Sequence, residues 1–156
     1  MRRSELGFTL IELIVVMAVL GILAMAAFPL AEISVQRDRE HELRRAVWQI
    51  RDALDAYKRA VDAGTVATAA GASGYPPDLQ TLVRGVPNAK SDGQPQFFLR
   101  RVPRDPFADE AGPADGTWGL RSYSSPSDAP RAGEDVYDVY SRSDKVGMNG
   151  VPLKEW

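Results

Sequence analysis

The chain has 156 residues, with 19 Lys and Arg against 21 Asp and Glu, so its formal net charge is −2. This length suits one domain, or one small domain with an appendage, and the charge balance argues against a generally basic nucleic-acid binder. The absence of cysteine and the presence of a single histidine, His41, exclude a disulfide framework, a Cys-ligated zinc site, a thiol nucleophile and any site that needs two histidines.

An apolar segment lies near the N-terminus, where residues 13–28 form a run of sixteen residues without a charge. Extended to 8–30, the segment has 23 residues, interrupted by Thr9 and Glu12. As a helix at about 1.5 Å per residue it is long enough to cross a hydrocarbon core of about 30 Å. Two arginines precede it, so the positive-inside rule places the N-terminus in the cytoplasm and the rest of the chain outside. A signal peptide would have a shorter apolar core, and a plain signal anchor does not explain Glu12.

The start of this segment reads Gly7-Phe8-Thr9-Leu10-Ile11-Glu12 and follows a short basic leader. The pattern resembles the type IV prepilin signature, which pilins share with the pseudopilins of type II secretion. The resemblance implies that a prepilin peptidase cleaves between Gly7 and Phe8 and that the same enzyme N-methylates Phe8. Because Gly7 has no side chain, an extended backbone at this position can enter a peptidase cleft.

Glu12 is the residue to which the resemblance assigns subunit assembly, together with the new α-amino group of Phe8. In a stacked filament, Glu12 of one subunit would pair with the Phe8 amine of a neighbour, which would offset the desolvation of both charges. A Glu12 that rests at the level of the lipid headgroups is the alternative.

A helical pattern continues beyond the apolar segment. Six apolar residues recur at alternating intervals of four and three, which is the spacing of one helical stripe: Leu43, Val47, Ile50, Leu54, Tyr57 and Val61. Residues 31–63 contain neither Gly nor Pro, and Gly64 marks the stop. The sequence therefore predicts one helix over 8–63, bent or locally melted at Pro29 and Gly21. We expect its stripe to pack on a globular domain, with a coiled-coil dimer as the alternative.

The rest of the chain is turn-rich and predicts a small domain. Residues 64–74 favour a flexible loop, and residues 75–83 favour a short helix that starts after two prolines. Residues 118–123 and 136–141 alternate like strands. Two or three short antiparallel strands against the long helix would make an α+β, type IV pilin-like fold. The predicted organisation is a cleaved leader at 1–7, a transmembrane and filament-core helix at 8–30, its amphipathic continuation at 31–63 and a periplasmic globular domain at 64–156.

Three motifs narrow the resemblance: Tyr-Pro-Pro-x-Leu at 75–79, Leu-x-x-x-Pro-x-Asp-Pro-Phe at 99–107 and Tyr-Asp-x-Tyr-Ser at 137–141. Together they are similar to the major, G-type pseudopilin of type II secretion systems. The resemblance implies a structural subunit without an active site, which polymerises in the inner membrane to drive protein export across the outer membrane. Its partners would be the prepilin peptidase, other copies of itself, minor pseudopilins and the inner-membrane assembly platform. The implied location is the inner membrane, with a single crossing and the C-terminal domain in the periplasm.

The family also binds calcium in its C-terminal loop, which makes Ca²⁺ the one cofactor that the resemblance implies. Ser141 and Asp144 match the early part of the ligand pattern, but the downstream pair of acids is absent. Calcium takes six to eight oxygen ligands, usually with several carboxylates. A loop held by backbone hydrogen bonds and by the packing of Trp156 is the alternative.

Two other functions remain open at this point. A type IV pilus subunit, major or minor, would serve adhesion, motility or DNA uptake; the short basic run Arg100, Arg101 and Arg104 is read as a solvated edge, and no nucleic-acid partner is expected. A membrane-anchored periplasmic enzyme is a remote alternative, because the dense acids of the chain have no fixed spacing and no catalytic motif occurs. These acids are Asp105, Asp109, Glu110 and Asp115.

Overall fold

In the computed structural model, the described backbone comprises residues 9–109 and 111–156, and side chains are described for all of these except residues 26–31. The chain divides into two compact units, Met1–Asp38 and Arg39–Trp156. The first described element, α1, begins in the first unit and ends in the second. All other described helices and strands belong to the second unit.

Helix α1 (Leu10–Asp62) has 53 residues, close to the predicted span of 8–63. Its backbone is helical through both Gly21 and Pro29, so the local melting expected at these residues does not occur; a bend there stays a prediction. At the C-terminal end, the Ala60 carbonyl accepts hydrogen bonds from the backbone N–H groups of Thr65 and Val66, over 2.9 and 3.2 Å. The turn that brings Thr65 and Val66 back to the Ala60 carbonyl needs the left-handed backbone of Gly64, which has a φ of 68°.

The predicted crossing segment, 8–30, is only partly described. Phe8 and the side chains of 26–31 lie outside the described residues. Within the part of the chain that is described, no helix holds a stretch both long and apolar enough to cross a membrane.

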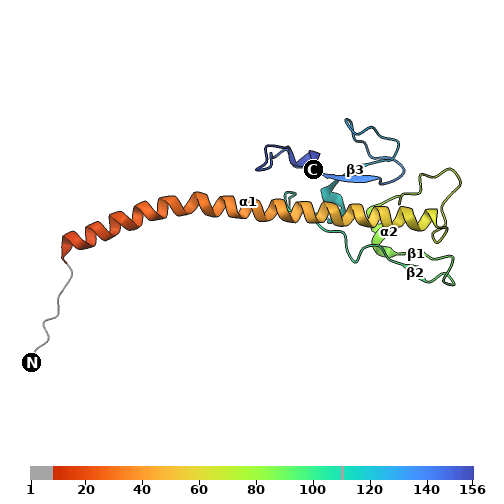
Figure 1. Cartoon of the computed structure of the whole chain (residues 1–156), viewed down its shortest axis with the longest axis horizontal. Coiled ribbons are helices and arrows are strands. Elements are labelled where there is room, and N and C mark those ends of the chain that lie inside the picture. The colour runs from red at the N-terminus through yellow and green to blue at the C-terminus, as the bar shows by residue number, and fades with distance from the viewer. Residues whose placement is uncertain (1–8, 110) are drawn as a thin grey trace, which may run out of the picture. The chain divides into compact units, whose positions relative to one another are not determined.

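The core of the second unit forms on the predicted stripe of α1. Figure 1 shows the shorter elements of this unit lying along the C-terminal part of that helix. Leu43, Ile50 and Leu54 are completely buried, and Val47 and Tyr57 are almost so, which confirms the stripe. Apolar side chains from the shorter elements complete this core: Leu79 and Leu82, Leu99 and Val102, Trp118, Val136, Val139 and Leu153. Small residues on the same face of α1, at positions 46, 53 and 60, are buried as well and widen the apolar face.

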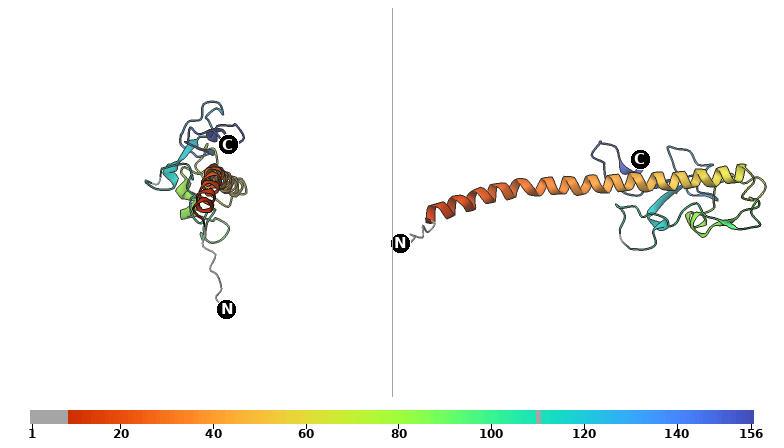
Figure 2. Two further views of the ribbon diagram at one scale, coloured as in Figure 1. Left: turned by 90° about the vertical axis from the view of Figure 1, so that its left-hand side faces the viewer. Right: turned by 60° about the horizontal axis from the view of Figure 1, so that its bottom comes forward.

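A short helix, α2 (Leu79–Arg84), forms where the two prolines predicted one. Asp78 is its N-cap, because the Asp78 carboxylate accepts a hydrogen bond from the N–H of Thr81 over 2.7 Å. Strands β1 (Val86–Pro87) and β2 (Pro95–Gln96) follow and pair antiparallel. Figures 1 and 2 place this pair near the C-terminal end of α1. The sequence did not predict it, because two-residue strands that each contain proline have no detectable alternation.

The second sheet contains the two strands that the sequence predicted. Strand β3 (Trp118–Arg121) pairs antiparallel with β4 (Asp138–Ser141), so that Trp118 lies opposite Ser141 and Arg121 opposite Asp138. A 3-10 turn, η1 (Asp115–Thr117), leads into β3, and another, η2 (Leu153–Glu155), closes the chain. A long helix packed on small antiparallel sheets confirms the α+β, pilin-like architecture.

Candidate functional site

The first turn of α1 carries the residue that the sequence assigns to assembly. The Thr9 hydroxyl accepts a hydrogen bond from the N–H of Glu12 over 3.3 Å, and the Thr9 carbonyl accepts one from the N–H of Leu13 over 3.2 Å. Thr9 is thus the N-cap, and Glu12 stands in the first turn, where a carboxylate favours the positive end of the helix dipole. Sequence reasoning missed this cap, although Thr-x-x-Glu is the pattern of a capping box. Gly7 and Phe8 lie outside the described residues.

The helix surface after this cap is apolar on every side. All described side chains from Thr9 to Met25 are exposed, and the large apolar ones range from Val16 at 46% to Met25 at 80%. A helix that is hydrophobic all round is stable when it is buried in a protein assembly or in lipid. This part of the chain therefore needs a covering that its own described residues do not supply.

The C-terminal segment is attached to α1 by polar side chains at the edge of the buried stripe. The Glu40 carboxylate accepts a hydrogen bond from the N–H of Met148 over 2.9 Å. The Arg44 guanidinium lies 4.6 Å from the centroid of the Trp156 ring, in cation–π geometry. Because positions 40, 44 and 51 lie on one side of the helix, the same edge also presents Arg51.

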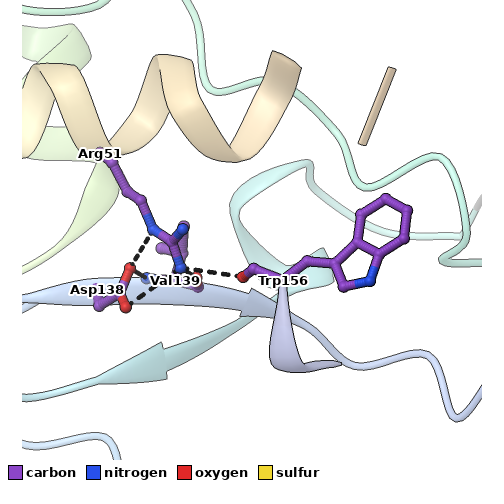
Figure 3. Close-up of polar contacts among 4 residues, drawn as sticks. All are labelled: Arg51, Asp138, Val139 and Trp156. Carbon is purple, nitrogen blue, oxygen red and sulfur yellow. Dashed lines mark hydrogen bonds and ion pairs between the residues drawn. The ribbon is translucent and has the colours of Figure 1, made fainter. Parts of the chain in front are cut away.

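Arg51 makes the densest set of contacts along this edge (Figure 3). Its Nε donates to Asp138 Oδ1 over 2.7 Å, and its Nη2 donates to Asp138 Oδ2 over 3.3 Å and to the Trp156 carbonyl over 3.0 Å. One side chain of α1 thus contacts strand β4 and Trp156, which lie 87 and 105 positions further along the chain. Sequence reasoning missed this link, since the helical spacing alone does not reveal which charged neighbours of the stripe face the domain.

Backbone contacts close the loop between β4 and η2. The N–H of Gly147 donates to the Val151 carbonyl over 2.9 Å, and the N–H of Leu153 donates to the Lys145 carbonyl over 3.0 Å. Gly147 also packs directly on Trp156, because a Cβ at this position would lie 2.4 Å from the indole Cζ2. The loop is therefore held by backbone hydrogen bonds and by Trp156, the arrangement that the sequence offered as the alternative to a calcium ion.

The two predicted calcium ligands occupy different environments. Ser141 is 1% exposed, and its hydroxyl donates to Asp105 Oδ2 over 2.6 Å and accepts from the N–H of Ser143 over 3.1 Å. Asp144 is exposed. No group of three or more His, Asp or Glu side chains suited to a metal occurs among the described residues. Ser141 and Asp144 by themselves do not fit the six to eight oxygens that calcium takes, and calcium binding stays a prediction.

Asp105 organises a buried polar network that sequence reasoning did not foresee. Its side chain is 1% exposed, and its Oδ1 accepts a hydrogen bond from the N–H of Phe107 over 2.8 Å. Its own N–H donates to the Thr117 hydroxyl over 3.2 Å. Both carboxylate oxygens are thus hydrogen-bonded, as buried polar atoms generally are. The Asp-Pro-Phe motif therefore has a structural basis, as an anchor for the start of β3 and the end of β4.

Comparison with known proteins gives one match. Residues 2–28 match the prokaryotic N-terminal methylation motif, and this range includes Gly7, Phe8 and Glu12. No curated protein and no solved structure matches this chain. The motif, together with the long helix and its small sheets, indicates a type IV pilin-like protein that is processed by a prepilin peptidase and assembles with other pilin subunits. Proteins of this structural class are typically not enzymes.

Proposed function

We propose that this protein is a structural subunit of a type II secretion pseudopilus, which polymerises from the inner membrane to drive protein export across the outer membrane. The observation that carries the proposal is the methylation motif, together with the helical segment 13–25, whose described side chains are all apolar and exposed. In this proposal, a prepilin peptidase removes residues 1–7 and methylates Phe8. Residues 8–30 then serve as the membrane anchor and the filament core, and the C-terminal domain lies in the periplasm.

The secretion system, rather than a pilus, is favoured by the sequence motifs at 75–79, 99–107 and 137–141. In the structure these motifs supply the cap of α2, the Asp105 network and strand β4. The chain has no cysteine with which to close its C-terminal loop. Protein contacts from Glu40, Arg44 and Arg51 hold the end of the chain instead.

The protein would act by assembly and not by catalysis. Among the acids considered as catalytic candidates, Asp105 has both oxygens hydrogen-bonded within the fold. Glu110 lies outside the described residues. We therefore assign no reaction to the chain.

To distinguish a secretion system from a pilus, we would compare the extracellular proteomes of a deletion strain and the complemented strain and count surface pili in parallel. Loss of specific extracellular proteins with intact pili is the expected result. Unchanged secretion with loss of pili, surface motility or DNA uptake would instead identify a type IV pilus subunit.

Glu12 offers a sharper test of assembly, because the cap joins the backbone N–H of residue 12 to the Thr9 hydroxyl and does not depend on the charge of the Glu12 side chain. Glutamine also occurs at this position of a capping box, so Glu12→Gln keeps the cap and removes the charge. If Glu12 pairs with the Phe8 amine of a neighbour, Glu12→Gln abolishes filament formation while the subunit still accumulates in the membrane. Thr9→Val, which removes the cap and keeps the charge, is the matched control and should still assemble. Normal filaments from Glu12→Gln would refute the pairing.

A further inference from the structure

A pocket of about 1040 Å³ lies in the second unit, between the C-terminal end of α1, the loop after it and the chain beyond β3. Its walls combine the rings of Tyr57, Tyr75 and Tyr123 with the hydroxyls of Ser73 and Ser124. The volume reaches the upper end of the range of small-molecule sites, about 300–1,000 Å³. Such sites typically join aromatic walls to a few polar groups, and this pocket has that composition.

The pocket contains an unusual exposed aromatic platform. Tyr123 is 60% exposed, although its ring stacks on Tyr75 at a centroid distance of 5.9 Å and an interplanar angle of 23°. Tyr137 meets both rings edge-on, at 5.0 Å from Tyr75 and 5.5 Å from Tyr123. One face of Tyr123 is therefore supported by protein, while much of the ring remains open to a ligand.

Polar contacts hold this platform in place before any ligand arrives. The N–H of Tyr123 donates to Asp135 Oδ1 over 2.8 Å. Burial alone would raise the pKa of Asp135, but hydrogen bonds from Ser73, from the Tyr123 N–H and from Ser122 outweigh this effect and lower it. Asp135 therefore stays ionised at neutral pH and fixes the backbone of Tyr123. Preorganisation of this kind reduces the entropic cost of binding.

The charges around the pocket favour a neutral ligand. The Lys58 ammonium is paired with Asp62 one helical turn further on, and the Asp135 carboxylate is engaged within the fold. Glu134 supplies an exposed acceptor at the rim. The Ser73 hydroxyl is engaged with Asp135 and with the N–H of Tyr75, whereas the Ser124 hydroxyl has one partner, Ser122 Oγ at 3.3 Å, and can make a further hydrogen bond. A suitable ligand must offer a flat apolar face to Tyr123 and many hydroxyl groups to its surroundings. A pyranose ring has this combination.

We propose that this pocket binds a neutral oligosaccharide, with one pyranose ring stacked on Tyr123 and its hydroxyls bonded to Glu134 and Ser124. The inference does not depend on the secretion proposal, because it rests only on the second unit. It assigns the domain a recognition task in addition to assembly.

The test uses the full chain in a detergent without a sugar head group, titrated with three neutral trisaccharides: cellotriose, tri-N-acetylchitotriose and maltotriose. Saturation-transfer NMR detects contact, and calorimetry gives the affinity. We expect at least one trisaccharide to bind, and Tyr123→Ala to weaken it about tenfold, which corresponds to about 1.4 kcal/mol. Tyr123→Phe should retain the binding, because it keeps the ring. Phe97→Ala is the matched control, since Phe97 is also an aromatic residue with 60% exposure but lies outside this pocket.

A second variant leaves the tyrosines intact. Ala69 is an exposed residue of the pocket wall, and Ala69→Gln should reduce binding by occupying the space. Circular dichroism verifies that each variant remains folded. Three results would overturn the proposal: no binding of any trisaccharide at 10 mM, about the weakest range that such titrations detect; equal binding by Tyr123→Ala and the unaltered chain; or equal losses in Tyr123→Ala and Phe97→Ala.

Discussion

Arg51 is the residue whose replacement should most clearly loosen the C-terminal segment from α1. Arg51→Met keeps the helical propensity and the apolar stem, but removes the donors to Asp138 and to the Trp156 carbonyl. A hydrogen bond to a charged group contributes about 1.5–3 kcal/mol, and an exposed ion pair at most about 1 kcal/mol. The Arg51 and Asp138 side chains are 32% and 25% exposed, so the pair is neither fully buried nor fully exposed, and its contribution should lie between these two energies. We therefore expect the free energy of unfolding to fall by about 2 kcal/mol.

Urea unfolding followed by tryptophan fluorescence is the suitable assay, because Trp118 and Trp156 lie in the affected region. Arg59→Met is the matched control: Arg59 is 67% exposed and 4.0 Å from Asp52, so its loss should change the stability by less than about 0.5 kcal/mol. The double variant Arg51→Met with Asp138→Asn should lose less than the sum of the single changes, because the two residues share one interaction. Equal effects of Arg51→Met and Arg59→Met, or full additivity, would refute the reasoning.

Three further predictions concern the loop and the second sheet. Gly147→Ala should lower the free energy of unfolding by about 1–3 kcal/mol, because the new Cβ would overlap the Trp156 ring. Gly116→Ala is the control and should be tolerated, since its Cβ would have its nearest neighbour at 3.6 Å; the urea midpoints of the two variants test the difference. Ser141→Ala removes the hydroxyl that donates to buried Asp105 and should lower the free energy of unfolding by about 2–3 kcal/mol. Ser141→Thr keeps the hydroxyl and should lower it less; equal losses in the two variants would contradict the hydrogen-bond explanation. The pKa of Asp135 is lowered from 3.8 in the folded state, so its contribution to stability is complete above the unfolded value and disappears as the pH falls through the folded value. Asp135→Asn should therefore flatten the loss of stability below about pH 4, which thermal melts across pH 3–6 would measure.

The attachment of the C-terminal loop bears on calcium dependence as well. Glu40 and Arg51 bond the loop region to α1 through protein groups, and Ser141 bonds to Asp105. If calcium adds to this arrangement at Ser141 and Asp144, millimolar calcium should raise the midpoint of thermal unfolding and a chelator should reverse the rise. An unchanged midpoint would remove calcium from the description of this subunit.

The sequence by itself determined the elements whose signals are local and periodic. The apolar run after Gly7-Phe8 and the stripe from Leu43 to Val61 predicted one helix, because a repeat of 3.6 residues can be read without knowing the partner surface. The alternation at 118–123 and 136–141 likewise predicted β3 and β4. The methylation motif is also local, since a peptidase reads a short extended segment.

Only the tertiary structure showed which polar side chains form hydrogen bonds between distant segments of the chain. Arg51 and Asp138 are 87 positions apart, and Ser141 and Asp105 are 36 apart. The motifs at 99–107 and 137–141 mark three of these four residues, but the local sequence does not show which side chain each of them meets. Their roles depend on which edge of the α1 stripe faces β4, and on the antiparallel register that brings Ser141 opposite Trp118. The same holds for the tyrosine pocket, because Tyr75, Tyr123 and Tyr137 come from three separate segments, which long-range backbone hydrogen bonds at Val136 and Tyr137 bring together.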